Sequence, residues 1–467
     1  MRTDEPAFQT IPSLGKMLRA RQISSVELAK YCLDRLARLG PRLHSVAALM
    51  PSRALQEAKA ADAELAAGKD RGPLHGIPYG AKDLFAARGA PTTWGAAPYR
   101  RQVFDSDATV VRRLHDAGAV LVAKLAMIEL AGGMGYNEAG ASLTGACRTP
   151  WSLDHWSGGS SSGSAASVSA GLVPFAIGSE TDGSIMNPAS YCGVTGLRPT
   201  YGLVSRHGAM ALSWTLDKVG PFCRSAQDAD LVLNAMAGRD PLDRTSVDTP
   251  ARNAAPSERK TWRIGVPAHV TDKVQPEVRH NFEAALRVLG TMGTVEHIAL
   301  PDFPYNAMIG AVISGEAGSA FRDIIEDGRV QSLASPLGRR GGYSSLTISA
   351  VDYIDAMRRR PPLRSAFAKI FETVDVLVGP TYSTVSYPID LPFDKAYPGT
   401  DDGPFITACN LAGIPAISVP SGFGHLGLPT GLMIAGPAFA EPDIVALAAR
   451  FQRQTAFHHK RPPVAVS

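Results

Sequence analysis

Two loops that are dense in glycine and serine hold the side chains best suited to chemistry. The stretch from 157 to 205 reads SGGSSSGSAASVSAGLVPFAIGSETDGSIMNPASYCGVTGLRPTYGLVS, with one loop around Ser160 and the other around Ser184. Small residues let the backbone turn sharply and bring its amide N–H groups close to a ligand. A serine hydroxyl there becomes a useful nucleophile once a base removes its proton. Because Ala/Val-rich segments that should be buried surround both loops, we interpret them as an active-site scaffold rather than a flexible linker.

Two other interpretations of such loops fit less well. A phosphate-binding loop requires GxxxxGK[ST], and that pattern is absent. A nucleophile elbow requires GxSxG after a strand, and residues 159–163 match it formally. We expect no strand at 151–157, however, and the mechanism would need a histidine partner. No histidine lies in a comparable loop, and we expect His425, His458 and His459 to be exposed.

The elements that must position these loops indicate an α/β protein. Helical and strand-like apolar patterns alternate along the chain, which favours a largely parallel or mixed sheet. Ser24 and Glu27 have the spacing of a capping box at the start of a helix. Further helices are predicted at 52–67, 110–117, 226–237 and 275–289, and strands at 120–123, 173–177, 263–266, 374–378 and 416–419.

Composition excludes several classes of partner. The 467 residues are 45% hydrophobic and 19% charged, with a net charge of +4 that is too small and too diffuse for a nucleic-acid interface. The local basic runs, 339–340 and 358–360, are expected on a solvated loop and a helix end. No apolar run reaches the roughly 18–20 residues of a membrane helix, and residues 1–10 do not resemble a secretory signal. We therefore expect no nucleic-acid partner, no membrane partner and a cytoplasmic location.

The five cysteines are far apart and show no metal-binding or redox spacing. We expect buried free thiols, no metal site and no cofactor. They are Cys32, Cys147, Cys192, Cys223 and Cys409.

The two loops and their flanks are similar to the defining region of the amidase signature family. That family's core reads close to GGSSGGSAA, then a strand, then DTGGSIR and CGxxGLKPT, with GIPxxxKD upstream and GLPAISVP and GLPxGLQ downstream. The resemblance extends from about residue 12 to about 455 in the family's order. It implies one large α/β domain over 1–467, built on a central mixed β-sheet flanked by helices. The matching pieces are 76–83, 158–166, 180–186, 192–200, 413–420 and 427–432.

Within that single domain we distinguish three parts. An N-terminal helical segment covers about 12–70, the catalytic core about 71–240, and the remaining sheet with its substrate-side loops about 261–460. The polar stretch 240–260 is interpreted as a surface excursion. The segment 332–345 (SLASPLGRRGGYSS) is expected to be a mobile loop, a candidate lid over the site.

The resemblance implies roles for three side chains. Ser184 corresponds to the nucleophile, Ser160 to a bridging serine that follows a cis peptide bond, and Lys82 to the base. The serines lie 24 residues apart, as an alignment without a gap requires. Lysine accepts a proton only when neutral, so Lys82 must be desolvated among groups that lower its pKa. Alone, a Lys-Asp pair at 82–83 would more commonly be a surface ion pair.

The resemblance also implies an oxyanion hole and a substrate contact. The backbone N–H groups of Thr181, Asp182, Gly183 and Ser184 would hold the oxyanion, and losing one such donor typically lowers the rate about 100-fold or more. Met134 and Tyr136 fall where similar enzymes place the substrate. Core packing and turn formation explain these two residues almost as well.

Three departures from the family's pattern bear on specificity. Ser162 and Asp182 replace glycines, and Met186 replaces a common arginine. The resulting ETDGS resembles a branch that includes peptide amidases. The glutaminase component of tRNA-dependent amidotransferases, which is also similar, needs an acidic residue where Gly403 stands, although Asp401 and Asp402 lie nearby.

These observations predict a stand-alone hydrolase that cuts C–N bonds of amides through an acyl-enzyme. Aryl amides and carbamates (urethanes) are the expected substrates, since the pocket lacks two fixed charges and Trp214 is a candidate for its lining. The alternative is the glutaminase (A) subunit of a tRNA-dependent amidotransferase, and a minor alternative is a non-enzymatic binding relative. A small-molecule amide, ester or carbamate is the expected partner, and the expected state is a monomer or homodimer.

Overall fold

The fold is organised around one mixed sheet. The structure is a computed structural model that describes residues 6–248 and 259–466. Over these residues the main sheet has 11 strands, and a separate two-stranded sheet lies beside it. The strands are β1 (Val46–Leu49), β2 (Pro78–Lys82), β3 (Val120–Leu125), β4 (Arg148–Thr149), β5 (Ser152–Trp156), β6 (Phe175–Glu180), β7 (Thr195–Arg198), β8 (Lys218–Cys223), β9 (Trp262–Pro267), β10 (Gly293–Ile298), β11 (Val376–Pro380), β12 (Ala416–Phe423) and β13 (Pro429–Ala435).

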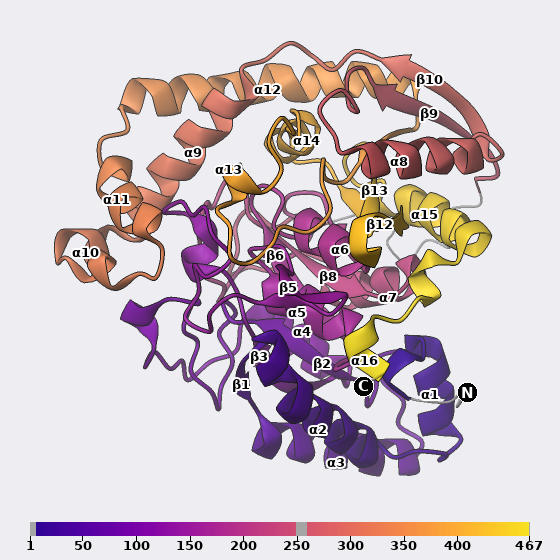
Figure 1. The fold of residues 1–467 in the computed structure, drawn as a ribbon. Helices are drawn as coiled ribbons and strands as arrows, with labels where there is room; N and C mark the ends of the chain where they lie inside the picture. Colours follow the sequence, from indigo (N-terminus) through magenta and orange to yellow (C-terminus); the bar gives the residue numbers. More distant parts are fainter. Residues whose placement is uncertain (1–5, 249–258, 467) are drawn as a thin grey trace.

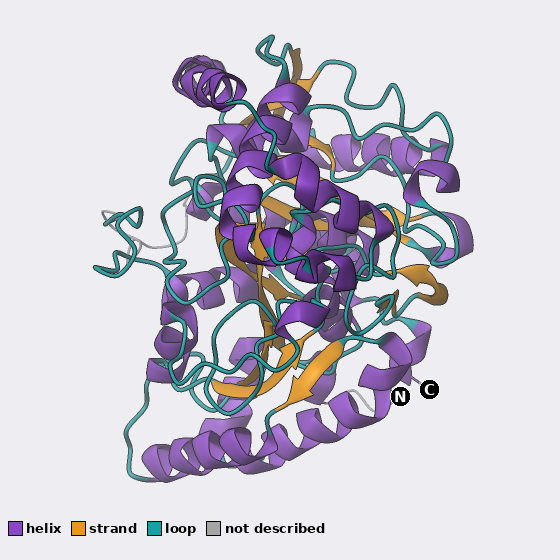
Figure 2. Ribbon diagram, turned by 90° about the vertical axis from the view of Figure 1, so that its left-hand side faces the viewer, coloured by secondary structure: helices purple, strands orange, loops and turns teal. Residues whose placement is uncertain are grey.

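Helices cover both faces of this sheet, which Figure 2 shows nearly edge-on. They are α1 (Ile11–Arg19), α2 (Ser25–Leu43), α3 (Pro51–Ala66), α4 (Thr109–Asp116), α5 (Ser162–Ser169), α6 (Met186–Cys192), α7 (Ala226–Met236), α8 (Pro276–Leu289), α9 (Tyr305–Ala320), α10 (Arg322–Glu326), α11 (Pro336–Ser345), α12 (Ala350–Thr373), α13 (Phe393–Ala396), α14 (Phe405–Ala412), α15 (Glu441–Thr455) and α16 (Pro463–Val466). The expected α/β class with a central mixed sheet is confirmed.

The sheet has two parallel parts separated by antiparallel strands, and β1 adds an antiparallel edge strand beside β3. The order is β1-β3-β2-β6-β8-β7-β12-β13-β11-β9-β10. Strands β3, β2 and β6 run parallel, as do β11, β9 and β10, while the strands between them pair antiparallel. The sheet therefore continues from the predicted catalytic core into the predicted 261–460 part without a break (Figure 1).

Most of the predicted elements are present with shifted ends. The capping box of α2 is confirmed, because Ser24 Oγ accepts from the Glu27 N–H and the Glu27 carboxylate accepts from the Ser24 N–H. The strand expected at 173–177 begins and ends later, at Phe175–Glu180, and the strand expected at 374–378 is Val376–Pro380. Propensity identifies the apolar run, but hydrogen bonding to neighbouring strands sets the ends.

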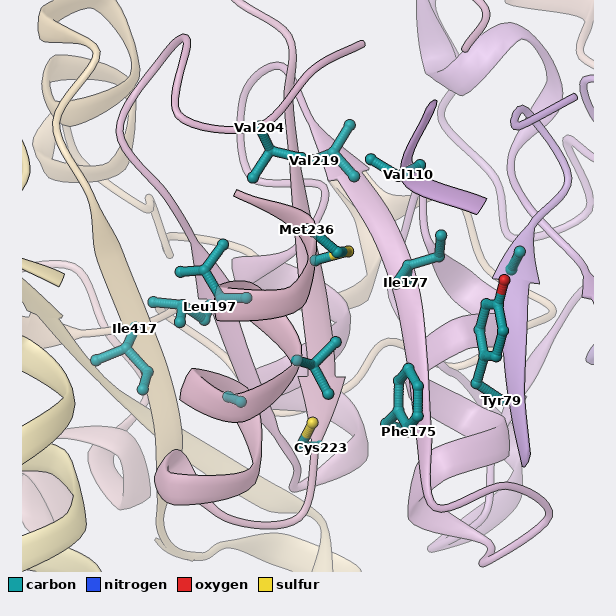
Figure 3. Close-up of a cluster of buried hydrophobic side chains, with 14 of the residues drawn as sticks. Tyr79, Val110, Phe175, Ile177, Leu197, Val204, Val219, Cys223, Met236 and Ile417 are labelled. Atoms are coloured by element: carbon teal, nitrogen blue, oxygen red, sulfur yellow. The ribbon is translucent and has the colours of Figure 1, made fainter. Parts of the chain in front are cut away.

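A large hydrophobic core lies under the β2–β6–β8 part of the sheet. Figure 3 shows side chains from these neighbouring strands meeting in it. Tyr79 and Phe175 stack with ring centroids 5.1 Å apart, and Ile177, Leu197 and Val219 are buried beside them. This packing fixes the spacing of β2 and β6, the two strands that lead into the site.

The prediction that residues 332–345 form a loop was wrong, because most of this segment forms the helix α11. Ser335 caps the helix by accepting from the Gly338 N–H at 3.3 Å, and the buried Glu129 carboxylate accepts from the Ala334 and Ser335 N–H groups at 2.8 Å. A Cβ on Gly341 would lie 1.9 Å from the carbonyl oxygen of Met134. The glycines of α11 therefore allow the helix to pack closely against Met134, and this packing outweighs their low helix propensity.

Two further expectations were wrong. Residues 152–156 do form a strand, β5, which pairs with β4. Arg360 lies inside α12 rather than at a solvated helix end. It is 2% exposed and donates to the carbonyl oxygens of Leu411 and Thr215. Figure 1 shows α12 crossing above α9 and α14, the helices that bury this part of it.

The polar stretch 240–260 is described only in part, since residues 249–258 lie outside the described residues. Asp240 at its start is buried and accepts hydrogen bonds from Thr109 and Ser205 at 2.6 Å.

No helix within 6–248 or 259–466 is long and apolar enough to span a bilayer. In the same residues no group of three His, Cys, Asp or Glu side chains could hold a metal ion.

Candidate active site

Sheet topology brings the three predicted catalytic side chains to one edge. Lys82 is the last residue of β2, and Ser184 follows the end of β6. Because β2 and β6 are parallel neighbours, their C-terminal ends meet at the same edge. Ser160 lies in the loop that leads into α5, which packs against both strands.

Lys82 is fully buried, and within the described residues its hydrogen-bond partners are all oxygen atoms. Its Nζ lies 2.7 Å from Ser160 Oγ, 3.1 Å from Ser179 Oγ and 3.4 Å from the Ser179 carbonyl oxygen. Burial lowers the pKa of Lys82 to about 7, against the opposing influence of Asp217 and Glu180. A substantial fraction of neutral amine is therefore available near neutral pH.

The backbone around Ser160 is held by hydrogen bonds and by close packing at Gly159. The Gly159–Ser160 peptide bond is cis, as the resemblance implies. The Gly159 N–H donates to Asn187 Oδ1 at 2.8 Å, and the Ile128 N–H donates to the Ser160 carbonyl oxygen at 3.1 Å. A Cβ at Gly159 would lie 2.7 Å from the Trp156 ring, so only glycine fits before the serine.

Ser184 is the most accessible of the three side chains. It is 8% exposed, whereas Lys82 and Ser160 are 0% exposed. In the part of the chain that the structure describes, its hydroxyl has no hydrogen-bond partner, while its carbonyl oxygen accepts from the Ser161 N–H at 3.4 Å. A substrate can thus reach Ser184, with Ser160 and Lys82 behind it.

The loop before Ser184 presents free amide groups. No acceptor within the described residues binds the N–H groups of Thr181, Asp182, Gly183 or Ser184. Gly183 has φ +85°, and a Cβ there would lie 3.1 Å from the Tyr382 hydroxyl. The next two amides, those of Ile185 and Met186, instead donate to the Glu180 carboxylate at 2.8 and 2.9 Å. Free donors that converge at one turn suit an oxyanion.

A network of buried charged residues holds the loop before Ser184 in place. This network was not identified from the sequence. Arg198 donates to Glu180 at 2.7 Å, and Asn410 Nδ2 donates to the same carboxylate at 2.9 Å. Burial opposes ionisation, but Arg198 and Lys218 hold the pKa of Glu180 at about 2. Lys218 donates to Asn410 Oδ1 at 2.7 Å, and burial lowers its pKa to about 7. Charged residues inside apolar strands were the available signal.

Asp182 joins the same network. Its carboxylate accepts from Thr407 Oγ1 at 3.0 Å and from Asn410 Nδ2 at 3.2 Å, which ties the loop to α14. Burial and the nearby charge of Glu180 raise the pKa of Asp182 to about 6. This departure from glycine therefore has a structural partner in α14.

Met134 and Tyr136, the predicted substrate contacts, pack against α11 and against Trp156, respectively. Met134 is buried against α11, where a Cβ on Gly342 would lie 3.4 Å from its sulfur. The Tyr136 ring packs edge-on against Trp156 at 6.2 Å. Trp156 in turn contacts Gly159, so Tyr136 is one ring removed from the bridging-serine loop.

The elbow interpretation is disfavoured by the position of Ser161. Although β5 precedes it, Ser161 is fully buried, and its hydroxyl donates to the Ser179 carbonyl oxygen at 3.1 Å. A serine in that environment helps to position β6 and is closed to a substrate.

Comparison with known proteins agrees with this geometry. The family model described as Amidase matches residues 27–445. The chain belongs to the amidase signature family. Membership makes it an enzyme that cuts carbon–nitrogen bonds, as the resemblance of its motifs predicts.

The relatives within this family have different activities. The chain is 36% identical to the A subunit of glutamyl-tRNA(Gln) amidotransferase from Moorella thermoacetica, over 98% of this chain and 99% of that protein. Among solved structures it is similar to the peptide amidase of Stenotrophomonas maltophilia, with 32% identity, a TM-score of 0.85 and coverage of 97% and 98%. It also matches a vestigial protein complex linked to the origin of an s-triazine catabolic enzyme, with 28% identity, a TM-score of 0.87 and coverage of 96% and 98%.

Proposed function

We propose that this amidase family member hydrolyses its amide through an acyl-enzyme on Ser184, with Ser160 as proton relay and Lys82 as base. The observation that carries the proposal is the buried Lys82 Nζ, which lies 2.7 Å from Ser160 Oγ and has a pKa lowered to about 7. A base with a pKa near the working pH transfers protons most effectively.

The proposed steps use the observed contact of Ser160 with Lys82, and they require the Ser184 hydroxyl, which has no partner within the described residues, to donate to Ser160 Oγ. Ser184 Oγ attacks the amide carbonyl while its proton passes to Ser160, whose own proton passes to neutral Lys82. The N–H groups of 181–184 stabilise the oxyanion. The Lys82 ammonium then returns a proton through Ser160 to the leaving nitrogen as the C–N bond breaks. Water attacks the acyl-enzyme by the same relay and restores Ser184.

The sequence relatives favour glutamine as the substrate. Full-length similarity at 36% identity to the glutaminase component of an amidotransferase supports the glutaminase alternative better than it supports a neutral aryl amide or carbamate. Under this candidate the chain would work with partner proteins and a tRNA substrate, contrary to the expectation of no nucleic-acid partner. The vestigial complex at 28% identity also supports a protein partner over a lone monomer or homodimer.

The site itself favours a neutral carboxamide. Gly403 offers no carboxylate for the glutamine amino group, and Met186 offers no guanidinium. The neighbouring acids are already engaged, because Asp402 accepts from the Ser383 N–H and hydroxyl, and Asp401 pairs with Lys273 at 3.4 Å. Similarity to a peptide amidase at 32% identity supports this candidate. We therefore propose a neutral amide first and glutamine second.

One panel assay separates the two candidates. Purified protein is tested on a nitroanilide, a neutral primary amide, an aryl carbamate and glutamine, with Ser184→Ala as the blank. A kcat/KM for neutral substrates above that for glutamine supports the first candidate, and the reverse ratio makes the glutaminase role the better assignment. Gly403 has φ +64°, which aspartate tolerates better than most residues. Gly403→Asp should therefore shift the ratio toward glutamine.

A cytoplasmic location is part of the same proposal. The five cysteines are unpaired and buried in the described structure, which supports a reducing compartment such as the cytoplasm.

A further inference from the structure

A cavity beside β6 is lined by Ser179, whose hydroxyl lies 3.1 Å from Lys82 Nζ. It has a volume of about 170 Å³ and is separate from the nucleophile, because neither Ser184 nor Ser160 lines it. Its inner end is formed by Ser179 and Asp217, each 8% exposed. Its outer end is formed by exposed residues, among them His207, Trp214 and Leu242. The cavity therefore connects the molecular surface with the buried end of β6.

Ser179 joins this cavity to the lysine. Its hydroxyl lies 3.1 Å from Lys82 Nζ, and its main chain is fixed by Ser161, whose hydroxyl donates to the Ser179 carbonyl oxygen. Lys82 thus has hydroxyl partners on two routes, Ser160 toward the nucleophile and Ser179 toward the cavity. The walls are mostly apolar, but Ser179, Asp217 and Arg206 supply polar groups, and a cavity of this volume has room for several water molecules.

We propose that Ser179 and this cavity form a solvent port through which Lys82 exchanges its proton with bulk water. The port rests on the proposed role of Lys82 as base. In the resting enzyme the Lys82 ammonium donates one proton to the Ser179 hydroxyl, which passes its own proton to a water in the cavity. This leaves the neutral amine, an intact Ser179 hydroxyl and a hydronium ion. A solvent base at the mouth accepts that proton. Lys82 can then return to its neutral form without solvent entering at Ser184.

Other charges around Lys82 act on it without replacing this route. Asp217, at the start of β8, and Glu180, at the end of β6, both favour the ammonium form. The Asp217 carboxylate is already bound by Thr181 Oγ1 at 2.6 Å and by the Leu212 and Ser213 N–H groups. Arg206, His207 and Asp243 face the outer part of the cavity. Variants that keep all of these charged groups therefore test the effect of the cavity volume alone.

The test changes the cavity volume and follows the protonation of Lys82. Ala209→Leu fills the cavity, and Met210→Ala enlarges it. The readout is the pH dependence of the rate at which a fluorophosphonate labels Ser184. Removing water from the cavity increases the desolvation of Lys82 and lowers its pKa. In Ala209→Leu the acidic limb of the pH–rate profile should therefore shift to lower pH by roughly half a unit. Met210→Ala should move it up. Ala67→Leu, an exposed change at the end of α3, is the matched control.

The outcomes separate the port from the proposed function. If Lys82→Ala labels Ser184 at the wild-type rate, the lysine is not the base and the proposed function fails. If Lys82→Ala is inactive but both cavity variants keep the wild-type pH limb, the port alone is overturned. If Ala209→Leu does not fold, the direction of the Met210→Ala shift decides.

Discussion

Replacing Lys82 with methionine should abolish hydrolysis and yet stabilise the folded chain near neutral pH. Lys82 is 0% exposed, and burial lowers its pKa from 10.5 to about 7. Between these values the unfolded chain binds more protons than the folded chain, so the stability of the wild-type protein rises with pH in this window. Methionine has a similar length and no charge, which removes this dependence.

The size of the effect follows from the two pKa values. Each unit of difference corresponds to about 1.4 kcal/mol. Burial of Lys82 therefore costs about 4 kcal/mol at pH 7.5 and about 1 kcal/mol at pH 9.5. Loss of the contacts with Ser160 and Ser179 also affects the variant, but that loss does not depend on pH. The stability difference between variant and wild type should thus shrink by about 2–3 kcal/mol between these pH values.

Urea denaturation of both proteins at pH 7.5 and 9.5, analysed with a common m-value, measures this change. Lys59→Met, which removes an exposed lysine from α3, controls for the loss of one positive charge. A difference that stays constant with pH, or grows as pH rises, would mean that Lys82 remains charged in the folded protein. That result would refute the neutral-base reasoning even if the variant were inactive.

Three further predictions concern the site and its supports. A fluorophosphonate adduct should map to Ser184 by mass spectrometry, and labelling should be orders of magnitude slower in a folded Ser160→Ala variant; an adduct on Ser161 would favour the elbow instead. Arg198→Met leaves the buried Glu180 carboxylate without its 2.7 Å partner and should lower stability by about 3–5 kcal/mol, as thermal unfolding would show, whereas an unchanged Tm would count against the network. Gly341→Ala should displace Met134 from α11 and raise KM more than it lowers kcat, because the new Cβ would lie 1.9 Å from the Met134 carbonyl oxygen; unaltered kinetics would separate α11 from substrate binding.

The fold class could be predicted from the sequence. Alternating helical and strand-like periods predicted an α/β protein with a largely parallel or mixed sheet, and the resemblance of the ordered motifs to the amidase signature family selected Lys82, Ser160 and Ser184. Their proximity depends on the parallel pairing of β2 and β6, which follows from that fold. Specific turns in these motifs need particular residues, so they leave a strong local signal.

The supporting network left only a weak signal, namely charged residues inside apolar strands, and this signal did not identify their partners. Glu180 and Asn410 are 230 positions apart in the chain, and their contact arises only after the sheet and α14 have assembled. The helix α11 was missed for a related reason, since its glycines disfavour a helix locally. Ser335, Glu129 and close packing on Met134 compensate for that preference. Tertiary contacts of this kind are invisible to a window of a few residues.

Lys82 and Asp83 are neighbours in the sequence, but they have different partners in the fold. Lys82 is the last residue of β2, and Asp83 lies in the turn that follows the strand. It pairs instead with the buried Lys124 at 2.8 Å. Among the described residues no carboxylate forms an ion pair with Lys82, and its ligands are the hydroxyls of Ser160 and Ser179 together with the Ser179 carbonyl oxygen. A surface Lys-Asp pair would have raised the pKa of the lysine. Because Asp83 is engaged by Lys124, burial is instead the largest influence on Lys82 and lowers its pKa.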